Sequence, residues 1–221
     1  MLSIFKKQSF LIDLFENAVD IHNHLLPGID DGSPSVEVSQ KMIGLYREIG
    51  FTQVIATPHI MEDYYHNNPE KIKQAFNELK SKTGDNSAIP FRAAAEYMLD
   101  SQFDKILENN ALLPLHEDLV LVEMSFFQKP NSLEEKLFDM RQKDYVPVMA
   151  HPERYSYIQN TAAFESLKDR GCYFQLNLLS LSGHYGKDAY KKAELLLLED
   201  MIDFTGTDAH KPEHLQKIKD I

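Results

Sequence analysis

The chain has 221 residues, 43% of them hydrophobic and 26% charged, which is enough for one domain with a well-buried core. Its formal net charge of −11 disfavours a nucleic-acid-binding or nuclease function, because such surfaces are normally basic. No apolar run approaches the roughly 18 residues that span a bilayer, and residues 1–10 lack the apolar core of a secretory signal. We therefore expect a protein that is not embedded in a membrane.

Strand-like and helix-like segments alternate along the chain. A predicted strand over Ala18–His24 is followed by a predicted helix over Val36–Ile49, which begins after Ser33-Pro34-Ser35 and ends at Gly50. The further predicted strands cover Thr52–Thr57, Phe91–Tyr97, Leu119–Met124, Tyr145–Ala150, Cys172–Leu178 and Met201–Thr205. The further predicted helices cover Pro69–Lys82, Ser101–Asn109, Ser132–Lys143, Thr161–Arg170 and Lys187–Glu199.

Seven strands that alternate with helices indicate parallel βαβ units and an α/β fold. The strands are continuous apolar runs, as expected when both faces of a sheet are buried. An open doubly wound sheet and a closed barrel both satisfy this pattern. A barrel is favoured because polar candidate ligands follow most of the strands, and a barrel lets these strand ends converge. We predict a distorted TIM-like (β/α)7 barrel that forms a single domain over residues 1–221.

Residues 1–17 form an N-terminal extension with an apolar stripe. We expect this stripe to pack on the barrel itself, and packing on a neighbouring copy in an oligomer is the alternative. The stripe consists of Phe5, Phe10, Leu11, Leu14 and Phe15.

Cys172 is the only cysteine, so no internal disulfide can form, which fits the reducing cytoplasm where we expect the protein. A cysteine-dependent phosphatase needs a thiolate in a phosphate-cradling loop that ends in arginine. Cys172 instead begins the strand-like segment 172–177, and no such loop follows it. We therefore predict a small buried hydrophobic residue and not a nucleophile.

His22 and His24 are the first of several polar residues at the ends of apolar strands. Alternate side chains of a strand point the same way, so the two Cα atoms lie about 6–7 Å apart and both imidazoles can bind one metal ion. Five further motifs have the same placement: Thr57-Pro58-His59, Ala95-Glu96, Val122-Glu123, Ala150-His151-Pro152 and Thr207-Asp208-Ala209-His210.

Together with Asp31, these motifs supply five histidines and four carboxylates. Such a mixed nitrogen and oxygen set suits manganese, iron or zinc, whereas calcium prefers oxygen alone. A single histidine at a strand end is more often structural, but nine residues with this placement make chance improbable. Nine ligands are too many for one ion, so the sequence predicts two or three ions.

These residues also give the chain a resemblance to a known family. The His-x-His strand and the other motifs resemble the PHP (polymerase and histidinol phosphatase) superfamily, and they occur in the family's order. The segments 20–32 (DIHNHLLPGIDDG) and 151–155 (HPERY) are most similar to its bacterial capsule-biosynthesis branch. The resemblance runs from about Val19 to His210. It implies the PHP fold and a manganese-dependent protein-tyrosine phosphatase that acts on the autophosphorylating tyrosine kinase of polysaccharide export.

The resemblance also implies three ions. The first would be held by His22, His24, Glu96 and Asp208, the second by the bridging Glu96 with Glu123 and His151, and the third by Asp31, His59 and His210. Asp30 and Asp31 are adjacent, so the sequence leaves open which one ligates, and Asp31 is favoured because it directly precedes Gly32 as in the family. Many superfamily members carry histidine where this chain has Glu123 or Asp31, and carboxylates there favour harder ions.

Arg154 is the candidate phosphate clamp, because its planar guanidinium suits two phosphate oxygens. The alternative is an ion pair with Glu153. Other residues in the loops could line a pocket, namely His184 and Tyr185 after the sixth strand and Tyr64, Tyr65 and His66 after His59. His116 and His214 belong to no motif and are predicted to be surface residues.

We expect hydrolysis of a phosphate monoester by metal-activated hydroxide without a covalent phospho-enzyme, with Arg154, Asp208 and His151 as the residues that carry catalysis. An ion-bound water or Asp208 is the candidate proton donor to the leaving oxygen. One alternative is a PHP phosphoesterase that acts on a small phosphomonoester such as histidinol phosphate. A second alternative is a catalytically silent scaffold that binds the kinase.

Overall fold

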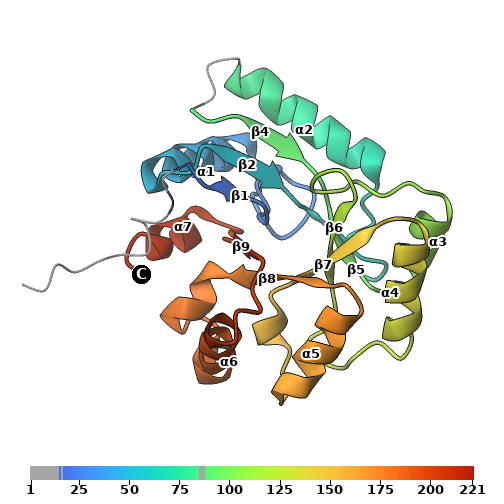
Figure 1. The fold of residues 1–221 in the computed structure, drawn as a ribbon. Coiled ribbons are helices and arrows are strands. Elements are labelled where there is room, and N and C mark those ends of the chain that lie inside the picture. Colours follow the sequence, from blue (N-terminus) through green and yellow to red (C-terminus); the bar gives the residue numbers. More distant parts are fainter. Residues whose placement is uncertain (1–14, 16, 85–87) are drawn as a thin grey trace, which may run out of the picture.

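The computed structural model describes residue 15, residues 17–84 and residues 88–221. Within them, parallel strands alternate with helices, and Figure 1 shows the helices arranged around the outside of the strands. The strands are β1 (Val19–Asp20), β2 (Gln53–Ala56), β3 (His59–Ile60), β4 (Phe91–Ala93), β5 (Glu96–Met98), β6 (Leu119–Glu123), β7 (Val146–Ala150), β8 (Tyr173–Asn177) and β9 (Phe204–Gly206). The helices are α1 (Val36–Ile49), α2 (Pro69–Thr83), α3 (Ser101–Glu108), α4 (Leu133–Gln142), α5 (Thr161–Asp169), α6 (Gly186–Leu198) and α7 (Pro212–Ile218).

The strands form two sheets. Two segments of the chain are interrupted, so that their first parts, β2 and β4, belong to one sheet and their second parts, β3 and β5, belong to the other. The three-stranded sheet has the order β1-β2-β4, and the six-stranded sheet has the order β3-β5-β6-β7-β8-β9. The predicted strand Thr52–Thr57 is followed after Pro58 by β3, and the predicted strand Phe91–Tyr97 is divided into β4 and β5. A parallel bridge between Asn23 and Ala209 links the β1 side to the β9 side. The predicted distorted seven-stranded α/β barrel is confirmed, with these interruptions as its distortion.

The predicted strand Ala18–His24 is wrong beyond Asp20. Regular pairing with β2 covers only Val19 and Asp20. After that, the backbone bonds with loop residues, because His22 accepts from the Asp208 N–H at 2.7 Å and the His24 N–H donates to Ala209 at 3.1 Å. The His-x-His segment therefore lies against the Thr-Asp-Ala-His segment instead of a neighbouring strand.

Two apolar cores follow from the alternation of side chains along the strands. Val120 and Val122 of β6 belong to the large core beneath the helices. Leu121, which lies between them in the sequence, belongs to a second, smaller core. This small cluster contains Ile55, Ala94, Leu115, Leu121, Val148 and Ala150, and it fills the space enclosed by the strands.

The helices agree with the sequence prediction to within one residue at each end, except for α7, which was not predicted. Local signals explain this agreement. At the start of α1, the Ser35 side chain accepts from the Val38 N–H, and at its end Gly50 has the left-handed φ of 108° that favours glycine. At the start of α2, the Asn68 side chain accepts from the Lys71 N–H.

Phe15 is the one residue of the predicted N-terminal stripe that the structure describes. It is buried, and its ring stacks on Phe51 with centroids 5.1 Å apart, so at this position the stripe packs on the barrel. The other four stripe residues lie outside the described residues. In the described part of the chain, no helix has both the length and the apolar character needed to cross a membrane.

Candidate metal centre

All nine predicted ligands gather at one end of the barrel. Glu123 is the last residue of β6, and His151 directly follows β7. Asp208 and His210 follow β9. The side chains form four overlapping groups, in each of which the ligand atoms lie within 4.8 Å of one another: His22, His24 and Asp208; His22, Glu96 and His151; His59, Glu96 and Glu123; and His24, Asp31, His59 and His210.

Glu96 is at the centre of these groups, and its carboxylate is fully buried. One oxygen, Oε2, lies 3.1 Å from His22 Nε2, 3.5 Å from His24 Nε2 and 3.0 Å from His59 Nδ1. The other oxygen, Oε1, lies 3.2 Å from His151 Nε2. A carboxylate that faces four imidazoles with both oxygens is placed to bridge two ions.

Asp208 lies between the imidazoles of His22 and His24 and the guanidinium of Arg154. Its Oδ1 lies 3.2 Å from His24 Nε2 and 3.5 Å from His22 Nε2. Its Oδ2 accepts from Arg154 and from Asn177, each at 2.7 Å. Arg154 therefore pairs with Asp208 and not with Glu153, whose Oε1 instead accepts from Ser180 and from a backbone N–H.

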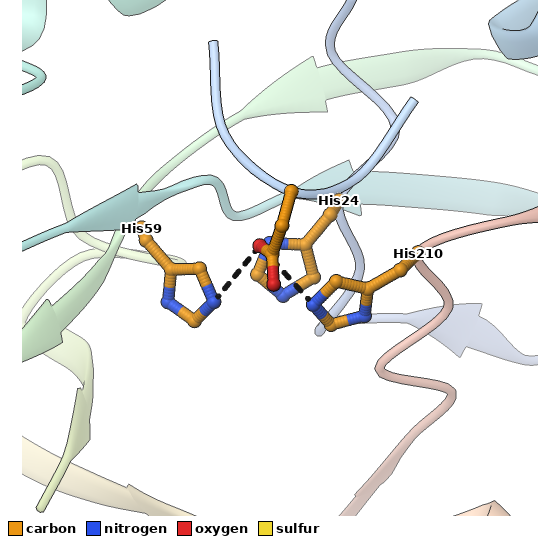
Figure 2. A group of neighbouring side chains, drawn as sticks. His24, His59 and His210 are labelled. Carbon is orange, nitrogen blue, oxygen red and sulfur yellow. Dashed lines mark ion pairs between the residues drawn. The ribbon is translucent and has the colours of Figure 1, made fainter. Parts of the chain in front are cut away.

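The outer group lies nearer the surface. The Asp31 carboxylate pairs at 3.5 Å with Nε2 of both His59 and His210, and Figure 2 shows the rings of His24, His59 and His210 around this carboxylate. The structure also brings Glu123 to His59, with 2.8 Å between Oε1 and Nδ1. Glu123 is thus grouped with His59, whereas the resemblance grouped it with His151.

The structure separates the roles of the two adjacent aspartates. Asp30 is buried, and its Oδ2 lies 2.8 Å from His24 Nδ1, on the far side of that ring from the ligand nitrogen. It also accepts from the backbone N–H groups of His59 and Gly32. Asp31 faces the site. Asp30 is therefore placed to orient a ligand and Asp31 to be one.

We expect the two aspartates to respond differently to substitution. Asp31→Ala should lower the bound metal by about one equivalent per chain. Asp30→Ala should keep the number of sites and weaken metal affinity by about 10–100-fold, the usual effect of losing an orienting partner. Elemental analysis and chelator competition measure the two effects, with the exposed Asp139→Ala as control. The reverse pattern would exchange the two roles.

The donor atoms fit bound divalent ions. Buried polar atoms normally have hydrogen-bond partners, and leaving them without one is costly. Within the described residues, six buried candidate ligand atoms have no partner with hydrogen-bond geometry: Nε2 of His22 and His24, Nδ1 of His59, both carboxylate oxygens of Glu96, and Oε1 of Glu123. Burial opposes ionisation of Glu96, yet the charges of neighbouring His22 and His59 hold its pKa well below the usual range. The unpartnered oxygen and nitrogen atoms are the donors that would face a cation.

Backbone strain accompanies two of the candidate ligands. His151 has a φ of 36° and Asp208 a φ of 48°, which is left-handed backbone that side chains other than glycine rarely adopt. Such conformations cost about 1–3 kcal/mol and concentrate at functional sites. The two strained residues lie in the turns that follow β7 and β9, and these turns place the side chains of His151 and Asp208 in the candidate metal centre.

Sequence reasoning missed three residues that support the site. Gln175 lies 2.7 Å from His22 Nδ1 through its Oε1, and Asn177 donates to Asp208. Both are fully buried, and because they are two positions apart on β8 their side chains lie on the same face of the strand. Two amides with this spacing in an apolar strand were a signal in the sequence. Phe126, the third, stacks on His151 with centroids 5.4 Å apart.

Arg154 is held by aromatic rings as well as by Asp208. Its guanidinium carbon lies 4.6 Å from the centroid of Phe126 and 4.0 Å from that of Tyr185. The side chain is 19% exposed. A guanidinium that is fixed on three sides and partly open toward solvent is oriented for an anion.

Two hollows flank the candidate metal centre. The first, which we call the aromatic hollow, has a volume of about 540 Å³, and its lining includes Asp31, His59, Glu123, Tyr64, Tyr65, Phe126 and Phe127. The second, which we call the cationic hollow, has a volume of about 520 Å³, and its lining includes Asp31, Arg154, Tyr185, Asp208, His210, Lys211 and His214. Asp31 borders both.

The remaining histidines divide between surface and site. His66 and His184 are exposed and line neither hollow, whereas His116 is exposed as predicted. The surface prediction for His214 is wrong, because α7 folds this half-buried residue behind the site. Its Nδ1 accepts from the His210 N–H at 3.3 Å.

Cys172 is buried, and burial raises its pKa from 9.0 to about 12. We expect this thiol to react with iodoacetamide about a thousandfold more slowly in the native chain than in the unfolded chain, because the thiolate is the nucleophile. Cys172→Ala should leave phosphatase activity unchanged within about twofold. Labelling rates and phosphate release test this, and loss of activity with retained metal would contradict the prediction of a structural cysteine.

The fold and the site define a PHP-type, TIM-like α/β barrel with a candidate metal centre of histidines and carboxylates. The chain belongs to the capsular polysaccharide synthesis CpsB/CapC family, whose model matches residues 18–218. It is 30% identical over 195 residues to the tyrosine-protein phosphatase YwqE of Bacillus subtilis, covering 87% of this chain and 77% of that protein. It is 28% identical over 217 residues to the tyrosine-protein phosphatase CpsB of Streptococcus pneumoniae, covering 92% and 88%.

Solved structures agree with this assignment. A chain from the crystal structures of YwqE and CpsB, which are metal-dependent tyrosine phosphatases, matches with a TM-score of 0.80 at 27% identity, covering 90% of this chain and 85% of that chain. The zinc-containing histidinol phosphate phosphatase of Lactococcus lactis matches with a TM-score of 0.53 at 14% identity, covering 91% and 92%. The second likeness concerns the fold alone.

Proposed function

We propose that this chain is a manganese-dependent protein-tyrosine phosphatase. The observation that carries the proposal is the convergence of nine imidazole and carboxylate side chains on one volume, with the guanidinium of Arg154 beside it. Family relatives that cover most of the chain are tyrosine-protein phosphatases. The carboxylates of Glu123 and Asp31 among the ligands favour manganese over softer ions.

His22, His24 and Asp208 would hold one ion, and Asp31, His59 and His210 another, as the groups indicate. Glu96, which belongs to two of the groups, would be shared with a third ion. The family resemblance gives Glu123 and His151 to this third ion, while the structure groups Glu123 with His59 and Glu96. When bound, divalent ions lower the pKa of water toward neutrality and offset the negative charge of a phosphate ester. The strained turns at His151 and Asp208 hold two of these ligands in place.

Arg154 would bind the phosphate oxygens that the ions leave free. Asp208 holds its NH1, so the remaining N–H groups are available to an anion. Asp208 has both oxygens engaged, because Oδ1 faces the imidazoles of His22 and His24 and Oδ2 accepts from Arg154 and Asn177. We therefore assign Asp208 to ligation and to orienting Arg154, and not to proton donation. A tyrosine leaving group, with a pKa of about 10, needs little such help.

The open surroundings of the site favour a protein substrate over a small metabolite. Phe127 and Tyr64 at the aromatic hollow are 95% and 73% exposed, so within the described residues no segment encloses a small molecule there. The complete set of ligands disfavours a silent scaffold. The membership of the capsular polysaccharide synthesis family supports the autophosphorylated tyrosine kinase of capsule export as the substrate, and the cytoplasm as the compartment.

The proposal is tested with metal-stripped protein, a phosphotyrosine peptide and histidinol phosphate, with manganese, iron, zinc or magnesium added back. We expect manganese to restore hydrolysis of the peptide in preference to histidinol phosphate, and His151→Ala to abolish it. Cys172→Ala is the matched control. Preference for histidinol phosphate would identify a metabolite phosphatase, and a chain that binds no metal would contradict the enzyme assignment. Phosphotyrosine loss from the purified kinase tests the partner.

A further inference from the structure

We infer that the aromatic hollow is a slot for the aryl ring of the substrate, with Phe127 and Tyr64 at its rim selecting aryl over alkyl phosphate monoesters. This inference rests on the proposed function, because it concerns the leaving group of the same reaction. Asp31, His59 and Glu123 border the hollow and are also candidate ligands. A phosphate held by the ions would therefore have its ester group next to this hollow.

The two hollows differ in chemistry, which decides where the ring lies. The cationic hollow offers Arg154, Lys211 and His214, and the ring face of its one tyrosine, Tyr185, is already covered by the guanidinium at 4.0 Å. Such a hollow suits charged oxygens. The aromatic hollow has four aromatic side chains, so an apolar ring gains more contact there.

Two of these rings pack against candidate ligands and so border the place where the phosphate would bind. The Tyr65 ring stacks on His59, with centroids 5.4 Å apart and planes at 12°. The Phe126 ring stacks on His151, with centroids 5.4 Å apart and planes at 29°. Because the histidines fix one face of each ring, the other parts of these rings are fixed walls of the slot.

The rim residues have few contacts with the rest of the chain. Phe127 is 95% exposed and comes from the loop between β6 and α4, and Tyr64 is 73% exposed and comes from the loop between β3 and α2. Of the nine exposed large apolar side chains in the described residues, three line this one hollow. Exposed apolar side chains gathered beside a candidate reaction centre are typical of a ligand site.

The first test compares two substrates of the manganese-loaded enzyme, a phosphotyrosine peptide and glycerol phosphate. Phe127→Ala and Tyr64→Ala should each raise KM for the peptide about three- to tenfold, the size of one lost aromatic contact, with kcat within about twofold. KM for glycerol phosphate should stay unchanged. Phe138→Ala, which removes a 62% exposed phenylalanine from α4, is the matched control. Equal effects on both substrates, or none on either, would overturn the slot.

The second test measures binding without turnover. The chain has no tryptophan, so Phe127→Trp introduces a single fluorescent reporter at the rim. We expect saturable change of its emission with phenylphosphonate and none with ethylphosphonate. Inhibition by both compounds without a change in emission would place the ring elsewhere and overturn the inference.

The two tests also separate this inference from the proposed function. If the unmodified enzyme hydrolyses no phosphate monoester, the proposed function fails. If it hydrolyses the peptide while both alanine variants keep the original KM, only the slot fails. A second copy of the chain as the occupant would give the latter result. With an apolar peptide side chain as the occupant, the alanine variants would raise KM for the peptide but the emission of Phe127→Trp would stay unchanged with phenylphosphonate, which also overturns the slot.

Discussion

Glu96→Gln is expected to lower kcat for a phosphotyrosine peptide by about a thousandfold or more, beyond the 10²–10³-fold effect of removing a single stabilising donor. Glutamate and glutamine side chains have nearly the same shape, but glutamine has no negative charge, and its amide nitrogen replaces one of the two acceptor oxygens. In this chain both oxygens face imidazoles, Oε2 with His22 Nε2 at 3.1 Å and Oε1 with His151 Nε2 at 3.2 Å, so the amide nitrogen would replace an acceptor in either orientation. The variant should therefore also retain less metal than the unmodified chain.

The measurement is the rate of phosphate release together with elemental analysis of the same preparation. Glu135→Gln, on the exposed face of α4, is the matched control and should leave both values unchanged. Far-ultraviolet circular dichroism checks that the fold persists. A Glu96→Gln variant with full metal content and activity within tenfold of normal would contradict the bridging role of Glu96.

Arg154→Ala is expected to lower kcat/KM by about 10²–10³-fold while the metal content stays unchanged. The physical reason is that the guanidinium is fixed before substrate binds, by Asp208 at 2.7 Å and by the rings of Phe126 and Tyr185. An oriented donor stabilises the negative phosphate oxygens without further reorganisation. Asp208 keeps its hydrogen bond from Asn177 in the variant, so its position as a ligand should persist.

Arg154→Lys separates charge from geometry. It keeps the positive charge but loses the planar fork and its stacking, so we expect it to recover only a small part of the loss. Arg47→Ala, an exposed arginine at the end of α1, is the matched control. If Arg154→Ala released metal in proportion to the lost activity, the guanidinium would serve the ligand set and not the phosphate.

The helices, and the residues that gather at the candidate metal centre, could be predicted from the sequence because their signals are local. Ser35 and Gly50 mark both ends of α1 within a few residues of the helix itself. His22 and His24 were found because their spacing on an apolar segment is itself a signal, although that segment is a regular strand only as far as Asp20. The pair of histidines could be recognised by its chemistry although the strand predicted around it was partly wrong.

Features that depend on distant parts of the chain could not be predicted in this way. The role of Asp31 as a candidate ligand depends on the approach of His59 and His210, and Gln175 acquires its role only when β8 comes next to the His-x-His segment. The division of the predicted strand Phe91–Tyr97 likewise depends on two neighbours, since β4 pairs with β2 and β5 pairs with β3 and β6. None of these partners is adjacent in the sequence.

The contact between the His-x-His and Thr-Asp-Ala-His segments has a consequence for biosynthesis. Thr207 donates through its backbone and its hydroxyl to Asp20, 187 positions earlier, and Asp208 and His210 complete the groups that His22 and His24 begin. A nascent chain on the ribosome has its first histidines long before these partners are made, so the centre cannot assemble during most of translation. Assembly of the candidate metal centre is therefore a late event, and products of premature termination that lack residues 207–210 would have no complete centre.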